Sequence, residues 1–329
     1  MEDDIKVSVI VVTYNQEDSI SAALESILQQ KCDFKYEIII GEDCSEDSTR
    51  AICREYSRKY PSIIRLIEND YNKGLRDNYY DCLLKARGKY IADLAGDDVW
   101  VAEDKLQLQA DVLDSDENIV LVHTNWQYKD IKSGDITSAW GKSGYPYPRL
   151  ANKDEIIPIL LSSSHVIHSC TAMFRNKDFK AVYDNYRDAF RNSTFIVEDI
   201  QLFTLLATRG KVLFIDKICL HYSINGSGLT SETSKEKTFD TYFSTLKLYN
   251  YLSTLMNVDS AVLDVRNRKQ YHYILMLAFY LCDSVRRNMI KNAGNELKIS
   301  PSLKSRIALM LSSNAILWKV SRYLINKIR

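Results

Sequence analysis

The sequence predicts an α/β fold built on a parallel sheet, followed by a helical carboxyl-terminal region. Strand and helix patterns alternate through the first third of the chain, which is typical of βαβ units. From about Thr238 onward the apolar spacing is helical throughout. The chain has 329 residues, of which 46% are hydrophobic, so it is long enough to bury a core around such a sheet.

The first strand is the β-branched run Val7 to Val12, whose nearly continuous apolar character indicates cover on both faces. A helix follows Ser19, which suits an N-cap. Pro61 ends the second helix and Gly88 closes the third. The expected strands are 7–12, 36–40, 63–67, 90–94 and 119–123, and the expected helices are 20–28, 47–60, 78–86 and 105–113.

After Trp126 the alternation lapses. The stretch 133–148 holds three glycines, two prolines and three aromatic residues, which predicts a long surface loop. The remaining expected elements are a buried strand or turn over 160–174, a helix over 199–208 and a strand over 212–215.

Composition excludes several classes of protein. Forty-three basic residues balance 43 acidic ones, so no global charge favours nucleic acid as a partner. Seven scattered cysteines do not form a disulfide framework, which favours a reducing, cytoplasmic compartment. The amino terminus lacks a signal-peptide pattern. The longest unbroken apolar run, Tyr273 to Cys282, is too short to cross a bilayer.

The ends of the predicted strands carry the candidate chemistry, because ligands bind beyond the carboxyl ends of parallel strands. Asp97 and Asp98 follow the strand over 90–94. Two carboxylates held close together either share a proton or bind a cation. Oxygen ligands suit Mg²⁺ or Mn²⁺, which bridge to phosphate oxygens. The residues alone leave open that Gly-Asp-Asp forms an ordinary turn.

The usual nucleotide-binding loops are missing from the sequence. No G-x-G-x-x-G follows the first strand, and no G-x-x-x-x-G-K-[ST] occurs anywhere. A dinucleotide dehydrogenase and a P-loop NTPase are therefore disfavoured. A nucleotide could instead be held through a metal-bound phosphate and a base gripped by side chains, with Tyr14 stacking on the base and Asp43 accepting a hydrogen bond.

Five motifs, in this order and spacing, resemble family 2 glycosyltransferases. The resemblance covers roughly residues 5–125, and a weaker likeness extends over 160–230. The motifs are Val9 to Asn15, Glu42 to Thr49, Asn72 to Gly74, Gly88 to Ala92 and Gly96 to Trp100.

The resemblance implies a GT-A fold, in which a mixed sheet is flanked by helices. It also implies a nucleotide-sugar donor, a divalent metal and inversion at the anomeric carbon. On this basis residues 1–125 form the nucleotide-sugar-binding half and 126–235 the acceptor-binding half. Residues 236–329 form a helical region outside the resemblance.

Site residues follow from the resemblance by position. Many members have a carboxylate two positions before the first acid of the pair, where this chain has Ala95, so metal dependence is expected to be weak. Asp97 would face the ribose or sugar and Asp98 the metal, with Asp97 as a further metal ligand. The other donor-binding residues implied are Thr13, Tyr14, Glu17, Asp43, Arg76, Asn78 and Trp100.

The catalytic base implied by the resemblance is Asp199, with Glu198 as its support or reserve. On residues alone, acids at a helix start are also explained by the helix dipole. His221 is a further potential metal or diphosphate ligand, although a lone histidine is more often structural. Uridine is the preferred base because Asp43 suits an imide N–H, and thymidine presents the same edge.

The predicted function is transfer of a sugar from a nucleoside-diphosphate donor to a glycan or lipid-linked sugar, in cell-envelope polysaccharide assembly. Two alternatives stay open. A sugar nucleotidyltransferase would need a glycine-rich, arginine-bearing loop after the first strand, and residues 11–17 contain neither feature. An inactive sugar-nucleotide or glycan binder is compatible with the same fold.

The carboxyl-terminal segment is strongly basic. Residues 285–329 contain ten Lys or Arg against one Glu, a charge of +9. Residues 303–329 form an amphipathic helical pattern, which suits the surface of an anionic membrane, here the inner face of the cell membrane. The alternative is a helix packed on the body or in a homodimer. The apolar face would carry Leu317, Val320, Leu324 and Ile328, and the polar face Lys319, Arg322, Asn326 and Arg329.

Overall fold

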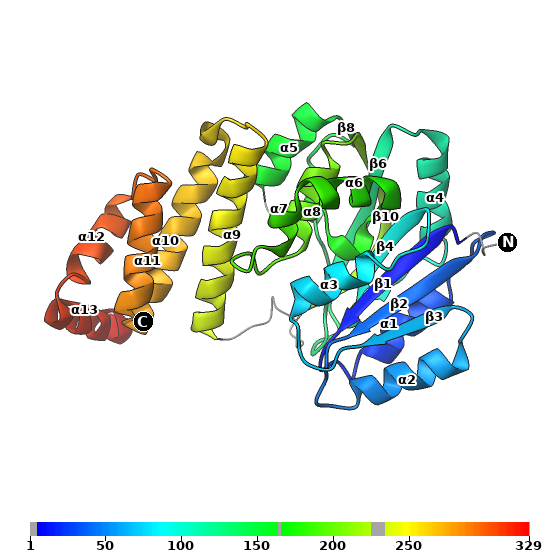
Figure 1. The fold of residues 1–329 in the computed structure, drawn as a ribbon. Coiled ribbons are helices and arrows are strands. Elements are labelled where there is room, and N and C mark those ends of the chain that lie inside the picture. The colour runs from blue at the N-terminus through cyan, green and yellow to red at the C-terminus, as the bar shows by residue number, and fades with distance from the viewer. Residues whose placement is uncertain (1–4, 164–165, 225–233, 329) are drawn as a thin grey trace. The chain divides into compact units, whose positions relative to one another are not determined.

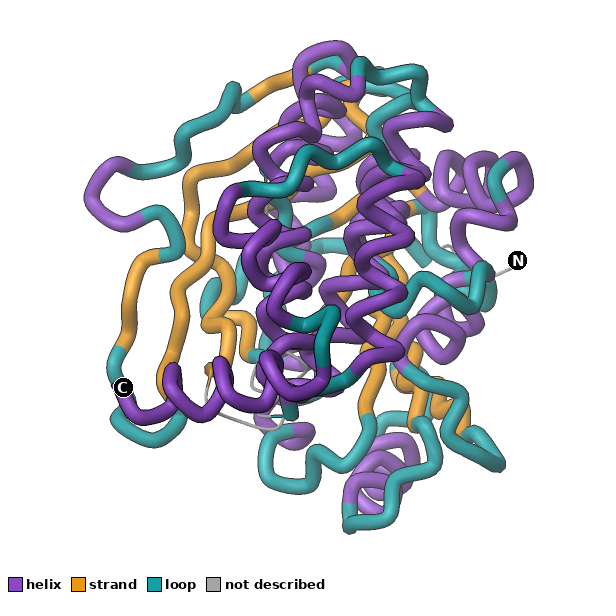
Figure 2. The backbone as a smooth tube through the Cα atoms, turned by 90° about the vertical axis from the view of Figure 1, so that its left-hand side faces the viewer, coloured by secondary structure: helices purple, strands orange, loops and turns teal. Residues whose placement is uncertain are grey.

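The structure, a computed structural model, describes residues 5–163, 166–224 and 234–328 (Figure 1). The chain forms two compact units. The described part of the first comprises residues 5–160, 166–192 and 198–224 and holds the strands, drawn in orange in Figure 2. The second comprises 161–163, 193–197 and 234–328 and contains no strand in its described residues.

Four parallel strands form the amino-terminal half of the sheet, in the order β3-β2-β1-β4. Their apolar runs, the connecting helices and the predicted βαβ alternation are confirmed. The strands are β1 (Val7–Thr13), β2 (Tyr36–Glu42), β3 (Ile64–Glu68) and β4 (Tyr90–Ala95), and the helices are α1 (Ile20–Leu28), α2 (Thr49–Lys59) and α3 (Leu75–Leu83).

Helices cover both faces of these strands. Ile38 and Ile40 of β2 pack in one buried cluster with Ile20 of α1 and Cys53 of α2. Gly41 faces the other side, where an added Cβ would collide with side chains of α3. Cover on both faces explains why the strands are apolar at successive positions rather than alternate ones.

The second half of the sheet is mixed, as the resemblance implies. β6 (Ile119–Asp130) and β10 (Lys211–Ile224) run parallel along most of their lengths. β9 (Met173–Arg175) lies antiparallel between β4 and β6 and joins the two halves. The short strands β5 (Val99–Trp100), β7 (Ile136–Ser138) and β8 (Leu150–Ala151) also pair antiparallel.

Two local predictions need correction. Residues 133–148 are not entirely loop, because β7 pairs with β6 and a 3₁₀ turn spans Gly141–Ser143. The segment expected to be strand or turn over 160–174 begins inside a helix. That helix, α5 (Lys153–Ser162), contains Pro158, whose missing N–H argues against a helix from sequence alone.

The helices between β5 and β10 pack on the sheet or link its strands. α4 begins at the predicted residue, and α8 places Asp199 in its first turn. The helices of this part of the chain are α5, given above, and α4 (Lys105–Ser115), α6 (Asn176–Asn185), α7 (Arg187–Arg191) and α8 (Asp199–Leu206).

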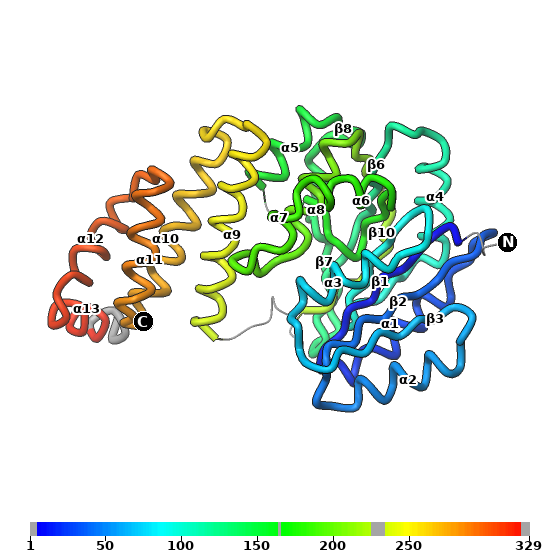
Figure 3. The backbone as a smooth tube through the Cα atoms, viewed as in Figure 1, coloured from blue at the N-terminus to red at the C-terminus, as the bar shows by residue number. Residues whose placement is uncertain are grey.

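The second unit has its own core, and its helices can be followed from yellow to red in Figure 3. Helix α10 contacts α9, α11 and α12. Tyr271, Leu275 and Phe279 of α10 are buried, and the helical character expected from about Thr238 onward is confirmed. The helices are α9 (Lys235–Leu255), α10 (Asp264–Leu281), α11 (Ser284–Glu296), α12 (Leu303–Leu311) and α13 (Ala315–Ile328).

A search of the described residues finds no helix that combines the length and the apolarity needed to span a bilayer.

Gly88 is expected to tolerate no side chain. A Cβ at this position would lie 2.5 Å from the backbone nitrogen of Ser8 and 2.8 Å from the carbonyl oxygen of Tyr90, and backbone atoms cannot rotate away. We expect Gly88→Ala to lower the free energy of unfolding by about 1–3 kcal/mol or more, measured by urea denaturation. Gly134→Ala is the control. A Cβ at this position has no other atom within 4 Å, so the only destabilisation comes from the positive φ of +78°. Equal losses for the two variants would contradict this account.

Candidate active site at the carboxyl edge of the sheet

Several of the predicted site residues, those after β1, β2 and β4, lie where three parallel strands end. Thr13 of β1 is in register with Glu42 of β2, and Val12 of β1 with Ala95 of β4. The segments that follow these strands therefore start at one edge of the sheet. Register alone thus brings the segments around Tyr14, Asp43 and Asp97 together.

The segment after β1 is locked to the segment after β2. The Thr13 hydroxyl donates to the Gln16 side-chain oxygen at 2.8 Å. The Glu17 carboxylate accepts from the backbone N–H of Ser48 at 2.9 Å. Tyr14 keeps 39% of its surface exposed, so its ring is open to a ligand, whereas Thr13 is buried.

Asp43 is buried and its carboxylate is already used by the protein. One oxygen accepts from the Asn69 side chain and from the backbone N–H of Lys73, both at 2.9 Å. The other accepts from the backbone N–H of Gly74 at 2.9 Å. Gly74 has a φ of +82° and immediately precedes α3. Asp43 therefore fixes the turn that starts α3, in addition to any contact with a nucleotide.

Arg76 and Asn78 are also held by protein groups. The Arg76 guanidinium pairs with Asp77 and donates to the backbone oxygen of Asn192. Asn78 is buried and its amide N–H donates to the backbone oxygen of Gly41 at 2.8 Å. In this structure Asn78 fastens α3 to β2.

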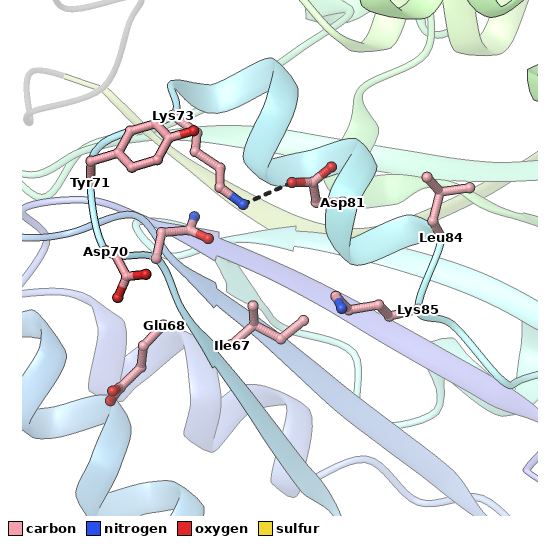
Figure 4. A pocket seen from close by; sticks show the side chains of 9 residues that line it. Ile67, Glu68, Asp70, Tyr71, Lys73, Asp81, Leu84 and Lys85 are labelled. Carbon is pink, nitrogen blue, oxygen red and sulfur yellow. Dashed lines mark hydrogen bonds and ion pairs between the residues drawn. The ribbon is translucent and has the colours of Figure 1, made fainter.

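A pocket of about 560 Å³ opens beside this region, between β3 and α3 (Figure 4). Lys73 and Asp81 point toward one another in it, with Nζ and Oδ2 2.9 Å apart. None of the predicted site residues lines this pocket. Asn69 and Lys73, which both bind Asp43, connect it to the carboxyl edge of the sheet.

The acid pair after β4 is held in a tight turn. Gly96 is required there, since a Cβ would collide with the side chains of Gln16 and Thr13. Asp98 is 1% exposed. Its Oδ1 accepts from the backbone N–H of Ser223 at 2.9 Å, whereas no N–H or O–H donor among the described residues reaches Oδ2. Burial raises the pKa of Asp98, and the neighbouring Asp97 carboxylate raises it further.

The groups around Asp98 fit a divalent cation. One ligand atom each from Asp98, His168 and Cys170 lies within 4.8 Å of the others. The Cys170 thiol forms a hydrogen bond with the Asp98 carboxylate. The three residues offer a cation oxygen, nitrogen and sulfur donors. Neither Asp97 nor His221, the other predicted metal ligands, belongs to this group within the described residues. His221 lies on β10 opposite Val99.

Trp100 is nearly enclosed by protein. It is 4% exposed, and its indole N–H donates to the backbone oxygen of Cys170 at 2.8 Å. The ammonium of Lys105 lies 4.1 Å from the centre of its ring. Burial lowers the pKa of Lys105 to about 8, so most of the Lys105 amines are still protonated near neutral pH.

A second group of acids begins at α8. Burial, and then the adjacent Asp199 carboxylate, raise the pKa of Glu198. Asp93 of β4 is buried and accepts from the Tyr79 hydroxyl at 2.8 Å. Burial raises the pKa of Asp93 to about 7, and Asp199 contributes to the same shift. Asp93, Glu198 and Asp199 therefore form one interacting set of carboxyl groups.

Sequence reasoning missed the positions of Asp93, His168 and Cys170 in these groups. Asp93 could have been noticed as a charged residue inside an otherwise apolar strand. His168 and Cys170 had no signal beyond their own residue types, because their relation to Asp98 depends on β9 pairing with β4. Residues 225–233, which include the glycines after His221, lie outside the described residues.

The predicted role of Asp43 can be separated from its structural role. An amide in place of the carboxylate would turn an NH₂ group toward backbone N–H donors. We therefore expect Asp43→Asn to lower the free energy of unfolding by about 1–3 kcal/mol without any nucleotide present, measured by urea denaturation. Asp70→Asn is the matched control on an exposed neighbouring residue. Wild-type stability of Asp43→Asn would mean that the three hydrogen bonds contribute little.

Comparison with protein families matches residues 8–182 to the family described as "Glycosyl transferase family 2". The Escherichia coli protein WfgD, a UDP-Glc:alpha-D-GlcNAc-diphosphoundecaprenol beta-1,3-glucosyltransferase, is 36% identical over 125 residues, which are 38% of this chain and 47% of WfgD. The chain spans less than half the length of the curated relatives that it matches.

Solved structures share the fold. Residues 1–349 of TarS from S. aureus, solved with UDP-GlcNAc, match with a TM-score of 0.61 and 19% identity over 97% of this chain and 89% of that TarS fragment. The mannosyltransferase PcManGT of Pyrobaculum calidifontis, with GDP-Man and Mn²⁺, matches with a TM-score of 0.52 and 16% identity over 97% of this chain and 87% of PcManGT. These likenesses confirm the expected GT-A architecture.

Proposed function

We propose that this chain, which belongs to glycosyl transferase family 2, is an inverting enzyme that transfers a sugar from a nucleoside diphosphate to a sugar hydroxyl. The observation that carries the proposal is the acid pair Asp97-Asp98 at the end of β4, in the same unit as the Glu198-Asp199 pair at the start of α8. We assign donor binding to residues 1–125 and acceptor binding to residues 126–235.

The donor is most simply a UDP-sugar. WfgD is named for UDP-Glc, and TarS was solved with UDP-GlcNAc. In this chain the half-exposed ring of Tyr14 can stack on a base. The second oxygen of Asp43 accepts a hydrogen bond from the backbone N–H of Gly74, and a carboxylate oxygen has a further lone pair for an imide N–H. Thymidine offers that same N–H.

Asp98 would hold a divalent cation, Mn²⁺ or Mg²⁺, with Asp97 beside it. The fit rests on the buried Oδ2 of Asp98, which lacks an N–H or O–H donor among the described residues. PcManGT was solved with Mn²⁺. When bound, such a cation stabilises negative charge on a departing diphosphate.

Asp199 would act as the general base. As the acceptor oxygen forms its bond to C1 of the donor sugar, the hydroxyl proton passes to the Asp199 carboxylate and the C1–O bond to the diphosphate breaks. Burial, and then the adjacent Asp199 carboxylate, raise the pKa of Glu198, which suits a supporting role for Glu198 beside the proposed base.

The acceptor is proposed to be a glycan or a lipid-linked sugar in cell-envelope polysaccharide assembly, as WfgD is named for a diphosphoundecaprenol-linked acceptor. Trp126, Trp140 and Tyr145 form edge-to-face contacts, with ring centres 5.0 and 5.2 Å apart along the series. Trp126 is 1% exposed and belongs to the core. Trp140 and Tyr145 are partly exposed, so they are the members of this series whose aromatic faces could meet a sugar ring.

The end of the chain is proposed to bind an anionic membrane surface. Helices α12 and α13 expose several large apolar side chains within a segment of charge +9. Side chains from 324 onward lie outside the described residues. The exposed fractions are 74% for Leu303, 64% for Met310, 73% for Ile316, 50% for Leu317, 50% for Val320 and 59% for Tyr323.

Asp199→Asn is expected to bind donor normally but to lose transfer by at least about a hundredfold, the scale of a general base. Donor binding is measured by calorimetry and transfer by release of nucleoside diphosphate. Asp264→Asn is the matched control, because Asp264 is an exposed aspartate that begins α10 in the second unit.

Three outcomes are informative. Near-normal turnover of Asp199→Asn, with loss in Glu198→Gln, would move the base to Glu198. Normal turnover in both would reject the pair as the base. Donor binding without turnover in the wild-type protein would favour an inactive sugar-nucleotide binder.

Leu303→Ser combined with Ile316→Ser is expected to reduce sedimentation with anionic vesicles about tenfold or more, because each buried apolar side chain contributes about 1.5–3 kcal/mol. Ile131→Ser, an exposed apolar residue of the first unit, is the control. Unchanged sedimentation, with a concentration-dependent dimer lost in the double variant, would instead assign this surface to a homodimer.

A further inference from the structure

Helix α3 presents two acids, one turn apart, to a single arginine. Asp77 and Asp81 are four positions apart and therefore lie on one side of the helix. The guanidinium of Arg191, the last residue of α7, donates to Oδ1 of Asp77 at 3.1 Å and to Oδ1 of Asp81 at 2.7 Å. Its Nε–H donates to the Tyr183 hydroxyl at 2.9 Å. Arg191 thus fastens α3 to α7 through hydrogen bonds between charged groups, which are stronger than neutral ones.

Asp81 also connects to the turn that Asp43 fixes. Nζ of Lys73 lies 2.9 Å from Oδ2 of Asp81 (Figure 4), and the backbone N–H of Lys73 donates to Asp43. Burial by itself would raise the pKa of Asp81, but hydrogen bonds from Lys73 and Arg191 outweigh it and hold that pKa below its usual value. Asp81 is therefore ionised near neutral pH. A continuous series of contacts runs from the predicted base-binding acid to α7.

Tyr80, between the two acids in the sequence, reaches the start of α8. It is buried, and its hydroxyl donates to the backbone oxygen of Glu198. Glu198 is the N-cap residue of α8, whose first turn carries Asp199. The Tyr80 ring packs edge-to-face on Phe190, with centres 5.1 Å apart, and the Arg191 guanidinium lies 5.7 Å from its centre. Residues of α7 therefore restrict where the Tyr80 hydroxyl can point.

A second arginine supports the same arrangement from α3. Arg76 pairs with Asp77 at 2.9 Å and donates to the backbone oxygen of Asn192, the residue after Arg191. Asp77 is thus shared by two arginines, one from each helix. A shift of either helix against the other would break hydrogen bonds to charged groups.

We propose that Arg191 and Tyr80 are positioning residues for sugar transfer: Arg191 holds α3, and Tyr80 on α3 fixes the start of α8, where the Asp199 carboxylate must stand. The inference deepens the proposed function, on which it rests for the role of Asp199. A general base acts only within hydrogen-bond reach of the proton that it accepts. A displacement of about 1 Å at the reacting groups lowers a rate by about a hundredfold.

Tyr80→Phe removes one hydroxyl and keeps the buried ring. We expect kcat for sugar transfer to fall about tenfold or more, because the start of α8 loses its contact with α3. The KM for the donor and the Kd of UDP should stay within about twofold of the wild-type values, since an interaction that serves only the transition state lowers kcat. Release of nucleoside diphosphate gives kcat and KM, and calorimetry gives the Kd.

Arg191→Gln should lower kcat to a similar extent. Arg191→Lys should recover part of the loss, because an ammonium keeps the charge but lacks the planar fork that reaches both acids. Arg187→Gln is the matched control, at an exposed arginine of the same helix. Arg87→Gln is the control for destabilisation alone. It removes two side-chain hydrogen bonds to the buried Glu37, so it should lower the free energy of unfolding in urea and leave kcat unchanged.

Hydrogen exchange measures the positioning without any turnover. In the absence of nucleotide, the backbone amides of α8 should exchange about tenfold faster in Tyr80→Phe and in Arg191→Gln than in the wild type, the scale of one lost hydrogen bond. The amides of β1 and β2 should exchange as in the wild type, which also shows that each variant is folded. Mass spectrometry of peptides covering 198–206 reports the difference.

Failure of this inference and failure of the proposed function give different results. If the wild type transfers sugar and both Tyr80→Phe and Arg191→Gln keep its kcat, the inference is wrong and the proposed function stands. Equal losses of kcat in Arg87→Gln and Arg191→Gln would also overturn it, because stability alone would then explain the effect. If the wild type transfers no sugar, the proposed function is wrong. Faster exchange of α8 in the two variants would then still assign Arg191 and Tyr80 to fixing its start, and unchanged exchange would reject that as well.

Discussion

A buried carboxylate must be compensated, and this requirement organises the carboxyl edge of the sheet. Taking an ionised carboxyl group out of water costs several kcal/mol unless hydrogen bonds or an opposite charge replace its hydration. Asp43 meets the requirement with three protein donors. Asp98 meets it with the Ser223 N–H and the Cys170 thiol. Glu198, Asp93 and Asp98 also have raised pKa values. The buried carboxyl groups of the first unit are therefore compensated in different ways.

These differences suit acidic residues of the same type to different roles. An acid saturated by backbone N–H groups, such as Asp43, builds a turn and can offer only a remaining lone pair to a ligand. An acid with a buried oxygen that no N–H or O–H donor among the described residues reaches, such as Asp98, suits a cation. A carboxyl group with a raised pKa beside a second acid, as at Glu198 and Asp199, suits proton transfer. Family membership and these three states are mutually consistent.

The second unit has a hydrophobic core of its own, to which α10 contributes. Trp318 of α13 is also buried, and its indole N–H donates to the backbone oxygen of Phe279 at 2.9 Å. One side of α13 is thus satisfied within the unit, while Ile316, Leu317 and Val320 remain exposed. Exposed apolar groups of this number, beside basic residues, indicate a surface that meets another phase or another protein.

The sequence by itself determined the βαβ alternation from β1 to β4, the helical carboxyl-terminal region and the acids at the strand ends, because these depend on local periodicity and on single residue types. Only the tertiary structure decided the short strands, the helix around Pro158 and the polar ends of β6 and β10, which are stabilised by pairing with distant segments. It also decided that the Asp43 carboxylate is hydrogen-bonded to Asn69, Lys73 and Gly74. The same holds for the position of His168 and Cys170 near Asp98. Such contacts join residues far apart in the chain, and no local pattern encodes them.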